Sequence, residues 1–222
     1  MTDYFRVTVS GALAAVFGMW LCVSVMASGA WAEVHNPVVI AVDPGHGGRD
    51  PGAIAHGIKE KNITLAIARD LAILIDRHKG MRAILTRRGD YYVGLRRRVE
   101  IARQAAVRLF VSIHADVGQP SWDWATVYTR KGHDATGQAS DRLADDITAS
   151  LKRLERTDRD RQANFVVLRD SHIPAVLVEV GYVTNARQAR QLGESAFQRR
   201  IADAIYVGIR NYLRRQRLVS RR

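Results

Sequence analysis

Short apolar runs alternate with longer amphipathic stretches along most of the chain. Residues 37–42 form a β-branched apolar run that stops at the turn sequence Asp43-Pro44-Gly45, as a buried strand does. Residues 62–77 instead carry apolar side chains every three or four positions, which predicts a helix with one buried face. The pattern therefore predicts strands and helices in turn.

The same criteria assign the remaining elements. Strands are expected at residues 81–86, 108–114, 124–130, 165–168 and 175–180, and helices at 95–106, 140–154 and 197–214. Strands that alternate with helices indicate an α/β fold. We expect a single domain with a mainly parallel, mixed and twisted sheet that is covered by helices on both faces.

The first 32 residues have the pattern of an export signal. Residues 7–32 carry no charge and end in Ala30-Trp31-Ala32, an A-x-A cleavage site. The apolar run is also long enough to span a bilayer, so an uncleaved anchor is the alternative. We assign residues 1–32 to a signal peptide or anchor and residues 33–222 to an exported domain. The expected location is the periplasm, with a membrane-anchored or extracellular location as alternatives.

Charge and cysteine content limit the chemistry. The chain of 222 residues has 34 Lys and Arg against 22 Asp and Glu, a formal net charge of +12, which favours an anionic partner. We expect no nucleic acid, because no nucleic-acid-binding motif is present and the domain is exported. The arginine-rich tail from about residue 214 is a candidate contact for an anionic envelope surface. Cys22 is the single cysteine, so any metal must be held by His, Asp or Glu.

Ionisable residues gather where an α/β fold places its ligand sites, beyond the carboxyl ends of the strands. His46 follows the first predicted strand, His114 ends another, and Glu179 lies within the apolar run AVLVEV. Glu60, just before the first helix, falls on the same rim. Taken singly, the histidines could be turn or core residues and Glu60 a helix-start residue, but a carboxylate buried like Glu179 needs a cation, a proton or a metal. Two His and one Glu make a zinc site with a fourth position for water, and the other Glu can act as the base.

Longer motifs surround these residues. They are VDPGHGGRDPGA at 42–53, GIKEKNITLAIA at 57–68, TRRGD at 86–90, LFVSIHAD at 109–116 and IPAVLVEVGYVTN at 173–185. In this order the motifs resemble the N-acetylmuramoyl-L-alanine amidase family, zinc amidases of the cell wall, over nearly all of residues 38–212. The resemblance implies that His46, Glu60 and His114 ligate Zn²⁺ and that Glu179 is the catalytic carboxylate. It also implies that the substrate is peptidoglycan, cut between N-acetylmuramic acid and the L-alanine of the stem peptide.

The segment after His114 departs from the family pattern. It lacks a glycine at the entry to the next strand and carries Trp122 and Trp124, which stack on a sugar or pack the loop. The interval from His114 to Glu179 is too short for the inserted helix that blocks zinc in some relatives. We therefore expect no autoinhibitory helix and no obligatory activator.

Some assignments stay open at this point. Asp43 and Asp116 adjoin the two histidines and are expected to form turns or to orient the histidines. Arg96-Arg97-Arg98 is expected to be a solvated helix face. Two rival functions are a wall-binding module that has lost catalysis and a zinc peptidase that cuts elsewhere in the stem peptide. No substrate-binding residue is assigned.

Overall fold

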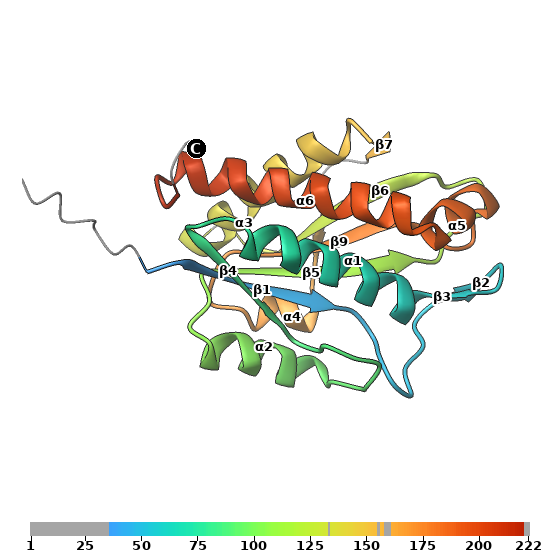
Figure 1. Cartoon of the computed structure of the whole chain (residues 1–222), viewed down its shortest axis with the longest axis horizontal. Coiled ribbons are helices and arrows are strands. Elements are labelled where there is room, and N and C mark those ends of the chain that lie inside the picture. Colours follow the sequence, from blue (N-terminus) through green and yellow to red (C-terminus); the bar gives the residue numbers. More distant parts are fainter. Residues whose placement is uncertain (1–35, 133, 155, 158–160, 220–222) are drawn as a thin grey trace, which may run out of the picture. The chain divides into compact units, whose positions relative to one another are not determined.

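A central β-sheet with helices on both faces makes up the domain (Figure 1). The computed structural model describes residues 36–132, 134–154, 156–157 and 161–219. The strands lie in the order β4-β1-β5-β9-β6-β7, and β8 also pairs with β6. Their bounds are β1 (Val38–Pro44), β4 (Met81–Leu85), β5 (Leu109–Asp116), β6 (Trp124–Arg130), β7 (Arg156–Thr157), β8 (Arg161–Ala163) and β9 (Ala175–Tyr182).

The sheet is mixed and mainly parallel, as predicted. β4, β1, β5 and β9 run parallel to one another, whereas β6 is antiparallel to β9. Strand β6 follows β5 after a loop too short for the crossover that a parallel strand would need, so it runs opposite to β5 and β9. The short strands β7 and β8 pair parallel with β6.

Helices of two groups cover the two faces. One face carries α1 (Glu60–Asp76), α3 (Ala135–Leu151) and α6 (Ser195–Arg215), and the other carries α2 (Leu95–Gln104) and the short α4 (Val166–Arg169) (Figure 1). Helix α5 (Ala186–Gly193) leads into α6, and a small hairpin of β2 (Ile54–Ala55) and β3 (Ile58–Lys59) precedes α1. The larger apolar core lies beneath α1, α3 and α6, and a smaller one beneath α2 and α4.

The sheet face that α2 and α4 cover changes from apolar to polar side chains along the strands. Successive side chains of a strand point to opposite faces, so Val176 and Val178 belong to the larger core while Leu177 belongs to the smaller one. Glu179 therefore lies on the α2/α4 face. On this face the strands begin with apolar residues and end with polar ones: Ala41, Phe110 and Ala175 give way to Asp43, Ser112, His114 and Glu179. The functional residues lie where the helical cover stops.

Residues 165–168, predicted as a strand, form the start of helix α4 instead. The prediction was wrong because a short apolar run has the same composition in a buried strand and in a buried helical turn. Phe165 is the N-terminal cap residue of α4, and Val167 and Leu168 are buried in the smaller core. Other predicted elements differ at their ends; α3 begins at Ala135, because Asp134 accepts a hydrogen bond from the Gly137 N–H and caps it.

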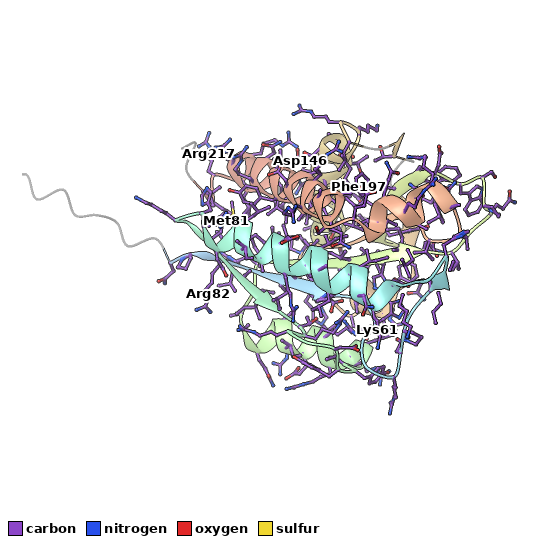
Figure 2. All side chains as sticks on the ribbon, turned by 45° about the vertical axis from the view of Figure 1, so that its right-hand side comes forward. Lys61, Met81, Arg82, Asp146, Phe197 and Arg217 are labelled. Atoms are coloured by element: carbon purple, nitrogen blue, oxygen red, sulfur yellow. The ribbon has the colours of Figure 1, made fainter. Side chains whose placement is uncertain are left out.

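The described residues begin at Asn36 and end at Val219, which packs against the larger core. The predicted signal segment, residues 1–32, lies outside the described residues. Within the described part, no helix combines the length and the apolar character that crossing a membrane requires. The arginine-rich tail continues from α6, and Arg217 lies at the opposite end of the domain from Lys61, at the start of α1 (Figure 2).

Candidate metal centre

The side chains of His46, Glu60 and His114 meet beyond the ends of β1 and β5. Their nearest ligand atoms all lie within 4.8 Å of one another. Oε1 of Glu60 lies 3.0 Å from Nε2 of His46 and 2.9 Å from Nδ1 of His114. Ligand atoms placed ~2.0–2.1 Å from a tetrahedral zinc ion are about 3.3 Å apart, close to these separations. The group can therefore hold one metal ion.

The Glu60 carboxylate is held by two backbone groups. The Ala53 N–H donates to Oε2 at 2.8 Å and the Ala115 N–H donates to Oε1 at 3.0 Å. Glu60 is the first residue of α1 and is only 4% exposed. Burial would raise its pKa, but hydrogen bonds from His114 and His46 and the charges of these histidines lower the pKa well below its usual value. Glu60 is thus ionised, as a metal ligand must be.

His46 projects from a tight loop after β1. Its φ of +60° is a left-handed backbone conformation, uncommon for a residue other than glycine. Its Nδ1 lies 2.9 Å from Oδ2 of Asp50, leaving Nε2 turned toward Glu60. A carboxylate behind a histidine fixes the orientation of its ring and raises its basicity. Asp50 was not predicted as a functional residue, although its place four residues after His46 within a glycine-rich motif was an available signal.

Glycines let the loop approach the three side chains closely. A Cβ on Gly45 would lie 2.3 Å from Cε1 of His114, and one on Gly52 would lie 2.5 Å from Oε2 of Glu60. Both distances are too short for a real contact, so larger residues would displace the ligands. The loop from Gly45 to Gly52 therefore forms one wall of the centre.

Two buried arginines donate hydrogen bonds to the backbone carbonyls of this loop. Arg98 donates to the carbonyls of Pro44 and His46, with a distance of 2.7 Å to the His46 oxygen. Arg87 donates to the carbonyls of Pro44 at 3.0 Å and Gly45 at 2.8 Å. Arg87 also reaches the Lys61 carbonyl at 2.8 Å, which ties the start of α1 to the loop. The two arginines thereby set the position of His46 relative to Glu60.

Asp43 is the buried acidic partner of this pair. It forms an ion pair of 2.8 Å with Arg98 and accepts hydrogen bonds from Thr86 and Ser112. Burial would raise the pKa of Asp43, but the charge of Arg98 and these hydrogen bonds lower it below its usual value. The predicted solvated face is thus wrong for Arg98, which is 2% exposed. Asp43 acts through Arg98 and the loop rather than on a histidine directly.

Asp116 plays a local part by comparison. Its Oδ1 accepts a hydrogen bond of 2.7 Å from the N–H of the next residue, Val117. This contact joins neighbouring residues at the end of β5, and it is neither a turn nor a contact with a histidine.

Glu179 lies beside the three ligands on the neighbouring strand. In the sheet it is directly opposite His114 of β5 on one side and Thr126 of β6 on the other. It is 7% exposed, and its Oε2 atom has no hydrogen-bond partner among the residues that the structure describes. Burial, with the charges of Asp116 and Glu60, raises its pKa well above the usual value. A buried carboxyl oxygen without a partner is costly, so Glu179 is a candidate functional group.

Comparison with known proteins agrees with this geometry. Residues 40–211 match the sequence profile of the Amidase_3 family, described as N-acetylmuramoyl-L-alanine amidase. The chain belongs to this amidase family. The match includes all four of His46, Glu60, His114 and Glu179.

Individual amidases are similar over most of the domain. The chain is 34% identical over 222 residues to the probable N-acetylmuramoyl-L-alanine amidase AmiB of Haemophilus influenzae, covering 78% of this chain and 51% of that protein. It is 33% identical to the amidase AmiA of Escherichia coli, covering 78% and 75% of the two chains. The chain thus spans about half the length of the first relative.

A solved amidase shares the fold. The N-acetylmuramoyl-L-alanine amidase AmiC2 of Nostoc punctiforme superposes with a TM-score of 0.73 at 36% identity, covering 80% of this chain and 97% of that one. The α/β domain described here is therefore the amidase fold.

The role of Arg98 predicts a contrast between neighbouring arginines. Arg98→Met leaves Asp43 buried without its ion-pair partner, so we expect the free energy of unfolding to fall by ~3 kcal/mol. Arg97→Met removes an exposed charge, and the expected change is within ~0.5 kcal/mol. Urea unfolding followed by circular dichroism measures both. Equal effects of the two substitutions would refute the role given to Arg98.

Proposed function

We propose that this chain hydrolyses the amide bond between N-acetylmuramic acid and the L-alanine of the stem peptide in peptidoglycan, with Zn²⁺ as cofactor. Membership of the amidase family and similarity to named amidases support the reaction. The observation that carries it is the meeting of His46, Glu60 and His114 beside the buried Glu179, whose Oε2 atom has no partner among the described residues. Half of the relative AmiB has no counterpart here, so the proposal concerns the catalytic domain.

The donor set favours zinc among the common divalent ions. Two imidazoles and one carboxylate suit Zn²⁺, whereas Mg²⁺ and Ca²⁺ prefer oxygen ligands alone. His46, Glu60 and His114 would hold the ion, and three protein ligands leave a position for water or substrate. When bound, the ion supplies Lewis acidity, which polarises the scissile carbonyl group and lowers the pKa of water.

Glu179 moves the proton in this scheme. Its carboxylate accepts a proton from the attacking water as the new C–O bond forms. It then gives that proton to the L-alanine nitrogen as the C–N bond breaks, so that an acid and a free amine are released. A pKa raised by burial suits a group that must take and return a proton. The free Oε2 atom leaves one oxygen available for the exchange.

We also propose that the enzyme works without an activating partner. Within the described interval between β5 and β9, helix α3 packs on α6 and helix α4 packs on α2. Both helices belong to the layers that cover the sheet. Neither is therefore a candidate for a helix that blocks the metal centre.

Digestion of purified peptidoglycan tests the reaction. With zinc and no added partner protein, we expect intact stem peptides that begin with L-alanine, and a chelator should abolish their release. Mass spectrometry of the products makes the measurement. Shortened peptides with the remainder still attached to glycan would indicate a peptidase, and no release at all would indicate a binding module. Release only after addition of a partner protein would refute independence from an activator.

Replacement of Glu179 separates catalysis from metal binding. Glu179→Gln keeps the shape of the side chain but cannot accept the proton, so we expect kcat to fall ~10²- to 10⁴-fold. The zinc content of the variant, measured by inductively coupled plasma mass spectrometry, should equal that of the wild type. Glu100→Gln, at an exposed ion pair with Arg103, is the matched control and should retain activity. Wild-type kcat in Glu179→Gln would disprove the assignment of the base.

Export is the remaining part of the proposal. The substrate lies outside the cytoplasm, and the uncharged segment 7–32 with its A-x-A end supports cleavage after Ala32. N-terminal sequencing of the protein recovered from the periplasm should begin at Glu33. A chain that begins at Met1 and fractionates with the membrane would instead identify an anchor.

A further inference from the structure

An aromatic wall, formed by Trp122, Trp124 and Tyr182, stands near Glu179. The ring centroids of the two tryptophans lie 5.3 Å apart, and Tyr182 meets them edge-on at 5.2 and 5.6 Å. Both tryptophans remain partly exposed, whereas Tyr182 is buried behind them. The wall thus presents indole surface to solvent.

The sheet places this wall next to the reaction centre. Thr126 of β6 lies directly opposite Glu179, and Trp124 comes two residues earlier on the same strand. Side chains two residues apart share a face and are ~7 Å apart along the strand. Trp124 therefore lies on the Glu179 face at a distance comparable to one sugar ring.

The loop that carries Trp122 is fixed by its neighbours. The Gly118 N–H donates to Oγ1 of Thr184 at 3.0 Å, and the same hydroxyl donates to the Gly118 carbonyl at 2.9 Å. Asn185 donates to the Pro120 carbonyl at 2.7 Å. A Cβ on Gly118 would lie 2.4 Å from Cε3 of Trp122, so glycine lets the indole pack closely against the backbone. A wall fixed in this way loses little conformational entropy when a ligand binds.

The wall also offers a hydrogen-bond donor that the described residues leave unused. Nε1 of Trp124 is buried and meets no acceptor in the part of the chain that the structure describes. A buried indole N–H normally has a partner. A ligand with both an apolar ring face and a carbonyl oxygen would satisfy the ring and the donor together.

The chemistry favours the sugar over the stem peptide. A pyranose ring presents C–H groups on its faces, and an N-acetyl group carries a carbonyl acceptor. The stem peptide carries carboxylates, whereas the charges around the wall are mixed in sign. The Arg187 guanidinium lies 3.6 Å from the Asp123 carboxylate. Tyr182 lies near both Asp116 and Arg161, and Arg156 is opposite Trp124 in the sheet. Charges of mixed sign do not single out the anionic peptide, so the exposed indole rings are the feature that favours the sugar.

We propose that the aromatic wall binds the N-acetylmuramoyl sugar on the acyl side of the scissile amide. This inference rests on the proposed amidase function, and it assigns Trp122 and Trp124 to specificity rather than to bond cleavage. It gives a function to the segment in which this chain departs from its family's sequence pattern.

Two substrates with the same scissile amide test the wall. One is an N-acetylmuramoyl tripeptide, and the other is the D-lactoyl tripeptide, which lacks the sugar ring. In Trp122→Ala and Trp124→Ala we expect kcat/KM for the muramoyl substrate to fall ~10-fold, the size of one lost aromatic contact. Activity on the lactoyl substrate should stay at the wild-type level. Trp124→Phe keeps a ring but removes the N–H, so an intermediate loss is expected.

Phe165→Ala is the matched control. Phe165 is 40% exposed and meets Tyr128 of β6 edge-on at 5.4 Å, at the end of the strand away from Trp124. Removal of its ring should leave kcat/KM unchanged for both substrates. Equal losses on both substrates in the tryptophan variants, or no loss on either, would overturn the sugar assignment.

A binding measurement keeps this test separate from catalysis. Saturation-transfer NMR with free N-acetylmuramic acid should show contact with the wild type and with Phe165→Ala, and an affinity ~10-fold weaker with Trp124→Ala. Unchanged sugar binding in Trp124→Ala would overturn the inference even if the enzyme proves active. Sugar binding without hydrolysis of either substrate would refute the amidase function and leave the wall supported.

Discussion

The candidate metal centre depends on a loop whose backbone carbonyls are held by two buried guanidinium groups. Arg87 and Arg98 donate to the carbonyls of Pro44, Gly45 and His46, while Asp43 supplies the acidic partner. Removing one member of such a network leaves a charge buried without its partner, which costs far more than the intact network contributes. The network therefore fixes the left-handed backbone at His46, and through Lys61 it fixes the start of α1 that carries Glu60.

The sheet contributes the other half of the site. His114 and Glu179 lie opposite one another on neighbouring parallel strands, so the spacing of the ladder sets the distance between a ligand and the proposed base. Both side chains lie on the face of the smaller core, beyond the apolar residues that α2 and α4 cover. The same face continues to β6, which brings the aromatic wall into the site. A rigid sheet thus supports the proposed cleavage and the proposed sugar recognition together.

Much of this arrangement could be predicted from the sequence. Apolar periodicity located the main strands and helices, and the rule for strand ends placed His46, Glu60, His114 and Glu179 on one rim. The supporting residues were harder to predict. Arg98 belongs to a run of three arginines, and nothing in the run itself distinguishes the buried one from its exposed neighbours. Asp50, Gly45 and Gly52 act through distances of a few ångströms in folded space, and Phe165–Leu168 was too short a run for its period to be read.

Zinc K-edge X-ray absorption of the purified, zinc-loaded protein measures how His46, Glu60 and His114 hold the ion. We expect four-coordinate zinc with two imidazole nitrogens at ~2.0–2.1 Å and oxygens at ~2.0–2.2 Å. His114→Ala should lose one imidazole from this shell, and His172→Ala, which changes a histidine outside the centre, should leave the spectrum unchanged. A six-coordinate shell of oxygens, or a spectrum that His114→Ala does not alter, would show that these three residues do not form the zinc site.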